Sequence, residues 1–206
     1  MLALIRHGQT DWNLAGRMQG RTDIPLNETG REQARVAASA LAAEHWDLVV
    51  SSPLQRARET AAIIAESLGV PLGGSYDELI EQDFGAAEGT LVSELDLRWP
   101  DRDFERKEPD EQVGPRGIRG LERIASEHPG ARVLVVAHGT LIRHTLATIA
   151  GHDPRHFPKL DNASSSFVSF TDAAWRVHTV GGVEFAEVLT DVEERAAATA
   201  AMRLAS

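Results

Sequence analysis

Cysteine is absent from the 206-residue sequence. The chain therefore has no disulfide, no thiol nucleophile and no cysteine-based zinc site, which excludes the usual disulfide-stapled secreted scaffold. Long apolar runs are missing too, because no segment approaches the roughly 18 residues of a membrane span. The apolar stretch at residues 2–5 is also too short for a signal peptide. We therefore expect a cytoplasmic protein with no membrane partner.

Basic residues are scarce relative to acidic ones: 21 Lys and Arg accompany 31 Asp and Glu, for a formal net charge of −10. This sign disfavours a broad nucleic-acid-binding surface, so we expect no nucleic-acid partner. Much of the excess lies between Asp77 and Glu111, where thirteen acidic residues accompany four basic ones. We interpret this segment as a solvated surface excursion, and an overhang above a site is the alternative.

Apolar runs that alternate with helical patterns predict an α/β fold. Their order indicates a three-layer α/β/α sandwich with a mainly parallel central sheet and an antiparallel edge. We expect one domain over residues 1–206, with an acidic insertion at about 77–115, and the edge hairpin offers a contact for a homodimer. Strands are predicted at residues 2–5, 48–52, 133–137, 165–171 and 175–180, helices at 28–43, 53–68, 116–127 and 140–149, irregular structure at 70–115, and a helix-prone tail from Val192.

Three of the predicted strands lead into residues suited to anion binding. The first strand is followed by Arg6 and His7, the second by a helix with Arg56 near its start, and the strand at 133–137 by His138. In an open parallel sheet, ligands bind at the carboxyl ends of the strands. Helices that begin at this edge also point free N–H groups toward it. We therefore expect a cationic pocket that suits a phosphate group.

These residue types have distinct chemical uses. A neutral histidine can attack phosphorus if its other ring nitrogen donates to a backbone carbonyl near the following glycine. Arginine forks bind phosphoryl oxygens and stay charged at any working pH. A carboxylic acid must protonate the leaving oxygen. Glu81 can supply that proton, but from spacing alone Asp83, Glu88 or Glu78 would serve nearly as well.

Several motifs occur in one order between residue 1 and about residue 170. They include Arg6-His7-Gly8-Gln9-Thr10 with Asn13, Arg17-Met18-Gln19-Gly20, Ser51-Ser52-Pro53-Leu54-Gln55-Arg56, Glu81-Gln82-Asp83-Phe84-Gly85 and Val136-Ala137-His138-Gly139. This ordered set resembles the signature of the histidine phosphatase superfamily, the phosphoglycerate mutase-like proteins. An isolated Arg-His-Gly triplet would be weak evidence, whereas the whole set is specific.

The resemblance implies a role for each matching residue. His7 would be the phosphorylated nucleophile and Glu81 the proton donor, which selects Glu81 among the four carboxylates. The family uses no metal and no organic cofactor, so we expect neither here. The residues that would complete the catalytic phosphate pocket are Arg6, Arg56 and His138, and those that would contact the substrate are Asn13, Thr10, Gln19, Gly20 and Gly139.

The sequence thus predicts a metal-independent phosphomonoester hydrolase that acts on a small phosphorylated metabolite through a phosphohistidine intermediate. The alternative is a mutase that returns the phosphoryl group to the substrate. The mutases that the chain resembles carry a longer insertion with added basic residues after the acid. Here only 57 positions separate Glu81 from His138, and the segment between them is mostly acidic, which favours hydrolysis. A non-catalytic phospho-ligand binding module is a third reading, disfavoured because every catalytic residue is present.

Overall fold

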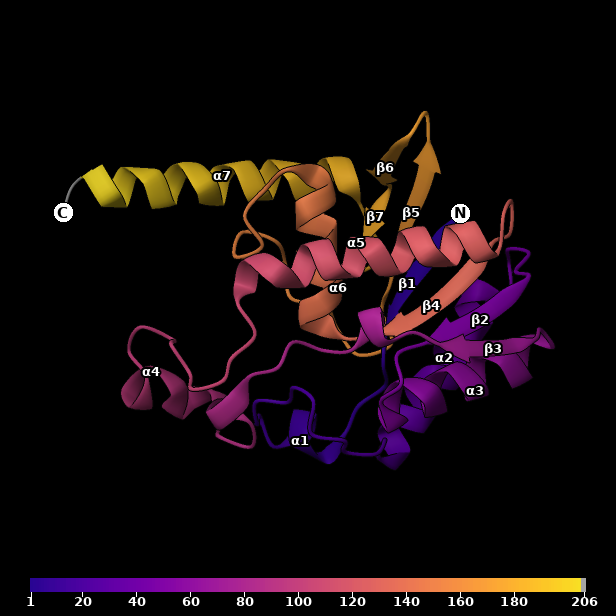
Figure 1. The fold of residues 1–206 in the computed structure, drawn as a ribbon, viewed down its shortest axis with the longest axis horizontal. Coiled ribbons are helices and arrows are strands. Elements are labelled where there is room, and N and C mark those ends of the chain that lie inside the picture. Colours follow the sequence, from indigo (N-terminus) through magenta and orange to yellow (C-terminus); the bar gives the residue numbers. More distant parts are fainter. Residues whose placement is uncertain (205–206) are drawn as a thin grey trace.

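The framework of the structure, a computed structural model that describes residues 1–204, is a six-stranded sheet. Its strands are β1 (Leu2–Arg6), β2 (Leu48–Ser51), β3 (Leu72–Ser75), β4 (Val133–Ala137), β5 (Ser165–Thr171) and β6 (Ala174–Val177). They lie in the order β3-β2-β4-β1-β5-β6 (Figure 1). The first four strands run parallel, while β5 and β6 are antiparallel to their neighbours. This arrangement confirms the predicted sheet.

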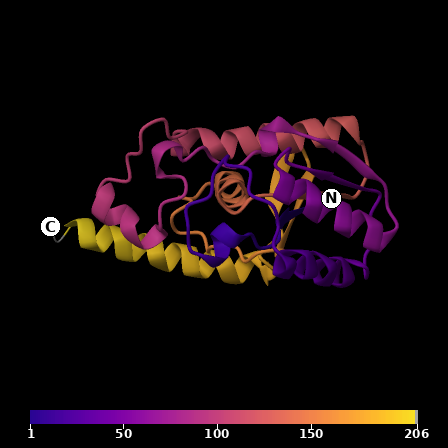
Figure 2. The same ribbon diagram turned by 90° about the horizontal axis from the view of Figure 1, so that it is seen from below.

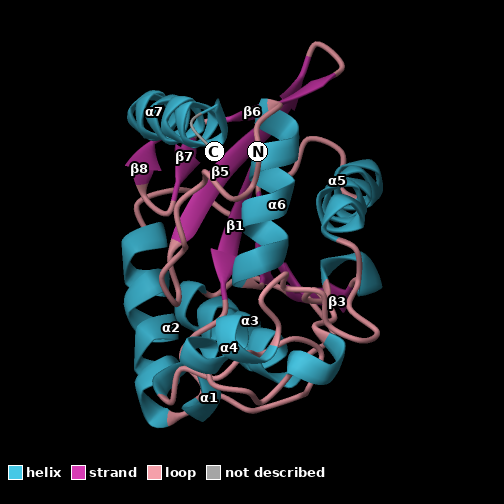
Figure 3. Ribbon diagram, turned by 90° about the vertical axis from the view of Figure 1, so that its left-hand side faces the viewer, coloured by secondary structure: helices cyan, strands magenta, loops and turns pink. Residues whose placement is uncertain are grey.

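Helices cover both faces of this sheet. They are α1 (Asp11–Leu14), α2 (Glu28–Leu41), α3 (Gln55–Leu68), α4 (Leu95–Arg98), α5 (Asp110–Glu127), α6 (Gly139–Ala150) and α7 (Phe185–Leu204), with 3₁₀ turns η1 (Asp77–Leu79), η2 (Gly85–Ala87) and η3 (Val92–Glu94). Core residues of α2 and α3 pack on one face, and those of α5, α6 and α7 pack on the other (Figure 3). The predicted three-layer sandwich is therefore confirmed. Within residues 1–204, no helix combines the length and apolarity that crossing a membrane requires.

The helices begin and end where local chemistry favours it. The Asn27 side chain accepts a hydrogen bond from the Gly30 N–H at 2.9 Å and caps the start of α2. Helices α3 and α6 each end at a glycine in the left-handed conformation, Gly69 and Gly151. The strand β4 is buried along its whole length, as the unbroken apolar run Val-Leu-Val-Val-Ala requires of a central parallel strand.

Helix α5 differs from the prediction, because it begins at Asp110 rather than at residue 116 and contains Pro115. Proline has no N–H, so the Glu111 carbonyl loses its donor inside the helix. Glu111 is exposed, and the solvent can satisfy that carbonyl. The helix therefore tolerates a residue that usually marks a boundary. The region before it, predicted as irregular, contains β3, three 3₁₀ turns and α4.

The strand predicted at 175–180 divides into two. Strand β6 ends at Val177, and Thr179–Val180 (β7) pairs with Val183–Glu184 (β8) in a separate two-stranded sheet. The His178 N–H donates to the Phe167 carbonyl at 2.9 Å and marks the division. Helix α7 then starts at Phe185, before the predicted start at Val192.

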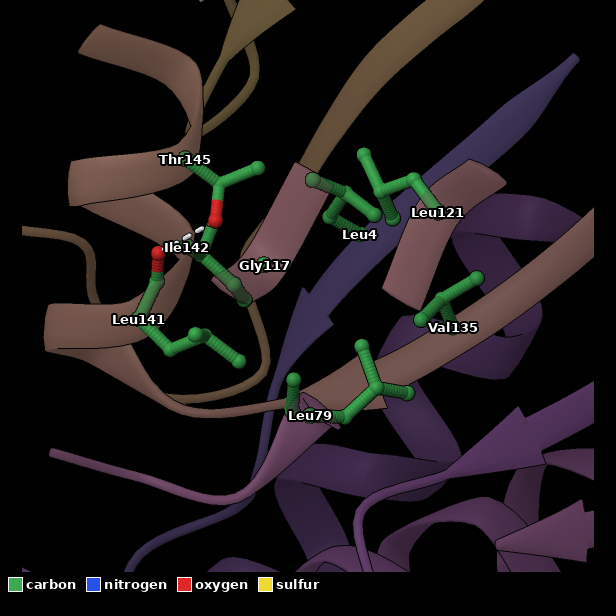
Figure 4. A pocket seen from close by; sticks show the side chains of 9 residues that line it. Leu4, Leu79, Gly117, Leu121, Val135, Leu141, Ile142 and Thr145 are labelled. Atoms are coloured by element: carbon green, nitrogen blue, oxygen red, sulfur yellow. Dashed lines mark hydrogen bonds between the residues drawn. The ribbon is translucent and has the colours of Figure 1, made fainter. Parts of the chain in front are cut away.

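The end of the sheet where β1 and β4 finish faces α1 and α4 (Figures 1 and 3). Figure 2 looks along α6, with the indigo segment that carries α1 in front of it. The interior between the sheet and α5–α6 has a void of about 10 Å³ (Figure 4). The hydroxyl of Thr145, which lines this void, donates to the Leu141 carbonyl at 2.8 Å. A void of this size is too small for a ligand. A larger pocket of about 450 Å³ lies outside this interior and is lined by residues of α1, η3 and α4 and the loops beside them, among them Trp12, Glu94 and Arg98.

Two glycines hold the loop after β1 against α2. A Cβ on Gly8 would lie 2.3 Å from the Gly30 carbonyl oxygen, and a Cβ on Gly30 would lie 2.1 Å from the Gln9 carbonyl oxygen. Neither distance leaves room for a side chain, so the two backbones touch directly. This contact positions the chain next to His7.

We predict that Gly30→Ala destabilises the protein, although alanine usually stabilises a helix by about 0.5–1 kcal/mol relative to glycine. The added methyl group meets backbone atoms that cannot move aside, and the expected loss in the free energy of unfolding is about 1–3 kcal/mol. Urea unfolding measures this change. The control is Gly74→Ala, where a Cβ meets nothing within 4 Å. Equal stabilities of the two variants would contradict the prediction.

Candidate active site

The register between β1 and β4 brings two histidines together. Arg6 lies opposite Ala137 in the parallel pair. His7 and His138 follow these two residues, so they lie side by side at the carboxyl ends of the strands. Their ring centroids are 5.2 Å apart and both side chains are buried. Two hydrophobic strands thus end in histidines whose rings are shielded from solvent.

Hydrogen bonds define the tautomer of His7. Its Nδ1 lies 2.7 Å from the Gly8 carbonyl oxygen, and its Nε2 accepts a hydrogen bond from Arg56 Nε at 3.2 Å. Because an arginine Nε–H can only donate, Nε2 carries the lone pair and Nδ1 carries the proton. The backbone contact expected from the sequence is therefore present, and the lone pair at Nε2 faces Arg56.

Arg56 is fully buried and donates from all three of its nitrogens. In addition to His7, it reaches the Thr22 carbonyl at 3.0 Å and the Gly20 carbonyl at 2.7 Å. Burial lowers the pKa of Arg56 to about 10, against the opposing effect of nearby acidic residues including Glu81. The guanidinium therefore stays charged at neutral pH.

Arg6 and His138 each present an unused polar atom. Arg6 donates to the Leu160 carbonyl at 2.6 Å, and His138 Nε2 lies 2.7 Å from Ser52 Oγ. The Nε of Arg6 and the Nδ1 of His138 are buried without a hydrogen-bond partner among residues 1–204. A Cβ on Gly139 would lie 3.2 Å from Arg6 Nε, so the glycine lets the helix begin close to this guanidinium. These groups can serve an anion that enters the pocket.

Both histidines are held in the neutral form. Burial lowers the pKa of His7 well below its ordinary value, and the charges of Arg56 and Arg6 lower it further. The pKa of His138 is lowered well below its ordinary value by burial, with Arg56 as the next cause. A neutral His7 has the lone pair that nucleophilic attack needs.

Glu81 lies against the start of α6. Its Oε1 accepts from the N–H groups of Gln82 and Leu141, both at 2.9 Å, and its Oε2 accepts from the Thr140 N–H at 3.0 Å. The first turn of α6 thus holds the carboxyl beside the residue that follows His138.

The other three acidic candidates have different partners. Glu88 accepts from the N–H groups of Arg21 and Thr22, both at 2.8 Å, and so holds the loop that supplies carbonyls to Arg56. Asp83 accepts from the Gly85 N–H at 2.7 Å, and Glu78 lies 3.3 Å from Arg123. The structure therefore brings Glu81 to the start of α6 and engages the other three elsewhere.

The predicted substrate contacts in and near α1 form a network of their own. The Thr10 hydroxyl donates to Gln19 Oε1 at 2.8 Å, and Asn13 Nδ2 donates to the same oxygen at 3.1 Å. Thr10 also caps α1. The Nε2 of Gln19 is buried and has no hydrogen-bond partner within residues 1–204. Gly20 packs against Glu88, because a Cβ there would lie 2.1 Å from a carboxylate oxygen.

Three further residues complete the site, and none of them was predicted. Ser52 bonds to His138, and the Thr60 hydroxyl accepts from the Gly8 N–H at 3.1 Å. Asn162 Nδ2 donates to the His7 carbonyl at 3.0 Å. Ser52 lies within a strand-end motif, and Thr60 lies one turn after Arg56, so both positions carried a signal. Asn162 is 155 positions from His7 and carried none.

The lowered histidine pKa values predict acid sensitivity. The unfolded chain binds protons at His7 and His138 near pH 6.5 and the folded chain does not, so stability falls as the pH drops below about 6.5. Each histidine contributes a slope of up to about 1.4 kcal/mol per pH unit. Urea unfolding between pH 5 and 8 measures this slope, which His138→Gln should reduce. A slope unchanged by His138→Gln would contradict the prediction.

Known proteins share this arrangement of sequence and fold. The chain is 41% identical over 177 residues to PhoE, an uncharacterized phosphatase of Bacillus subtilis, covering 85% of this chain and 91% of PhoE. It is 35% identical over 192 residues to a metal-independent phosphoserine phosphatase of Arabidopsis thaliana, covering 84% of this chain and 78% of that protein. Relatives named as phosphoglycerate mutases also match, among them a probable one, GpmB, of Photorhabdus laumondii.

A solved structure agrees with these relatives. The mycobacterial glucosyl-3-phosphoglycerate phosphatase in complex with VO3 superposes with a TM-score of 0.78 at 30% identity, over 87% of this chain and 98% of that one. The family model of the histidine phosphatase superfamily (branch 1) matches residues 2–182. The resemblance in the sequence is therefore confirmed, and the chain belongs to the histidine phosphatase superfamily.

Proposed function

We propose that this protein is a metal-independent phosphomonoester hydrolase that works through a phosphohistidine at His7. The observation that carries the proposal is the environment of His7. Its Nε2 lone pair lies beside the Arg56 guanidinium, and its Nδ1–H is held by the Gly8 carbonyl. A neutral nucleophile next to fixed positive charge suits attack on a dianionic phosphate.

In the first step, His7 Nε2 forms a bond to phosphorus while the bond from phosphorus to the ester oxygen breaks. Arg56 and Arg6 stabilise the negative charge on the equatorial phosphoryl oxygens. Glu81 in its protonated form transfers its proton to the leaving oxygen, so that an alcohol departs. His138 contributes another polar group from the neighbouring strand.

In the second step, a water molecule attacks the phosphohistidine on the phosphorus atom. Glu81, now a carboxylate, takes a proton from this water, and the phosphorus–nitrogen bond breaks. Inorganic phosphate and neutral His7 result, and Glu81 has regained its proton. The N–H groups of Gln82, Thr140 and Leu141 keep the carboxyl in one place through both steps.

The proposed substrate is a small phosphorylated metabolite, and the proposed setting is the cytoplasm. In support, the two arginines and two histidines at the strand ends suit one phosphoryl group, and the net charge of −10 disfavours nucleic-acid partners. The named activities of the Arabidopsis and mycobacterial relatives, on phosphoserine and glucosyl-3-phosphoglycerate, support hydrolysis of a small phosphomonoester.

A phosphoglycerate mutase activity is the second candidate, favoured by the match to GpmB. A mutase must retain its substrate while the phosphoryl group returns to it, which needs additional cationic contacts. Between Glu81 and His138, two arginines are held in ion pairs on the surface: Arg98 lies 2.6 Å from Glu94 and Arg102 lies 2.6 Å from Asp96. Because both arginines are already paired with acidic residues, they are poorly placed to hold a substrate. This favours hydrolysis over a mutase reaction.

We predict that the protein releases inorganic phosphate from phosphomonoesters in excess chelator and that His7→Ala lowers kcat by at least about 10³-fold. Loss of His7 removes the nucleophile and with it the covalent route that runs through this residue. A phosphate assay on 3-phosphoglycerate, sugar phosphates, nucleoside monophosphates and an aryl phosphate measures both effects.

The matched control is His45→Ala, because His45 is an exposed histidine away from the strand ends. Its activity should equal that of the unmodified protein. Phosphate release by His7→Ala at an unchanged rate would rule out the mechanism. Formation of 2-phosphoglycerate from 3-phosphoglycerate faster than phosphate release would instead establish the mutase.

A further inference from the structure

The pocket of about 450 Å³ beside α1, η3 and α4, which we call the α1–α4 pocket, is not used by the proposed mechanism. Its volume lies within the range of small-molecule sites, roughly 300–1,000 Å³. None of the described residues that line it belongs to the predicted catalytic or substrate-contacting set. The lining includes Trp12, Arg17, Gly89, Glu94 and Arg98. The α1–α4 pocket is therefore a second place where a small ligand can bind.

Backbone hydrogen bonds join two of the segments that line the α1–α4 pocket. The Met18 N–H donates to the Thr90 carbonyl at 2.8 Å, and the Gly89 N–H donates to the Met18 carbonyl at 2.9 Å. The Val92 N–H donates to the Gly16 carbonyl at 2.8 Å. Because these segments are already ordered, a ligand would not have to order them when it binds, which favours affinity.

Trp12 gives the α1–α4 pocket an aromatic surface. Gly89 has a positive φ of 80°, and a Cβ there would lie 3.2 Å from Trp12 Cη2. A side chain at this position would be strained and would press on the indole ring. Trp12 is half-buried and lines the pocket, so part of it is accessible to a ligand. An accessible indole can bind a planar ring by stacking.

Arg17 supplies a positive charge that has no acidic partner. Its Nη1 donates to the neutral Gly89 carbonyl at 2.6 Å, and no carboxylate among residues 1–204 lies within ion-pair distance of its guanidinium. Arg98, in contrast, lies 2.6 Å from Glu94. The carboxylate of Glu88, another lining residue, is engaged by backbone N–H groups of the neighbouring loop. This leaves Arg17 as the cation with free donors in the pocket.

We propose that the α1–α4 pocket binds a planar aromatic ligand with one negative charge, its ring on Trp12 and its anionic group on Arg17. A guanidinium fork matches the oxygens of a carboxylate or a phosphate. One negative charge fits better than two, because Glu88 and Glu94 line the same pocket and the chain carries a net charge of −10. Two sources provide this chemistry, namely a nucleotide with a phosphodiester and an aromatic carboxylate.

Calorimetry with two probes tests the proposal and distinguishes these sources. Cyclic adenosine monophosphate and nicotinate each have a planar ring and one negative charge, and neither is a phosphomonoester. We expect saturable binding of at least one probe, and the tighter one identifies the source. Adenosine and nicotinamide lack the charge and should bind about 10-fold more weakly than their charged counterparts. Absence of binding by both probes would overturn the proposal.

Substitutions of arginine locate the anionic group of the bound probe. Arg17→Gln, at an exposed position, should raise the dissociation constant about 10-fold, and Arg17→Lys should restore part of the affinity. The matched control is Arg58→Gln, because Arg58 is also exposed and has no acidic partner among residues 1–204. Neither this control nor Arg6→Gln should change the dissociation constant. A loss of affinity in Arg6→Gln but not in Arg17→Gln would place the probe at the strand ends and overturn the proposal.

Tryptophan fluorescence locates the ring of the probe independently. A ring stacked on Trp12 should quench the emission of this residue when cyclic adenosine monophosphate or nicotinate is added. Trp12→Phe keeps an aromatic side chain beside Gly89, so it should abolish the quenching while calorimetry still detects binding. Trp175→Phe, on β6, is the control and should retain the quenching. Quenching that persists unchanged in Trp12→Phe would show that the ring binds elsewhere and would refute the assignment.

Discussion

The burial of the Arg56 guanidinium is the constraint on which the arrangement of the site depends. A charge in the interior must be compensated, and three segments of the chain provide this compensation. The Gly20 and Thr22 carbonyls come from the loop after α1, and the His7 ring comes from the end of β1. The loop is in turn held by Glu88. Placing one cation therefore fixes His7, the loop and the excursion that carries Glu88 relative to one another.

The same constraint explains how an acidic chain holds a site for anions. The side chains that surround His7, namely Arg6, Arg56 and His138, are cationic or neutral, and burial keeps the acidic surface residues and the solvent from screening them. The arginines also hold His7 in the neutral form, since their charge opposes its protonation. The same two arginines thus supply positive charge at the strand ends and keep His7 neutral.

Much of the fold and part of the site were predictable from the sequence. Strand β4 was evident, because a short, unbroken apolar run is typical of a buried parallel strand. The polar residue that follows it, His138, was evident for the same reason, since it ends the run. The start of α5 was not, because local rules at Pro115 favour a boundary and tertiary packing overrides them. The contact of Asn162 with His7 was also hidden, since a bond between residues 155 positions apart depends on topology.

The proline in α5 also has a consequence for hydrogen exchange. Pro115 interrupts the backbone hydrogen bonds after the first turn of the helix, so this turn is joined less firmly to the rest. Asp110 in that turn accepts from Gln82 at 2.7 Å and lies 2.9 Å from Lys107, which links the turn to the excursion. Opening of this turn releases both contacts together. Amide protons in the first turn of α5 and in the excursion should therefore exchange as one cooperative unit, earlier than those of the helix after Pro115.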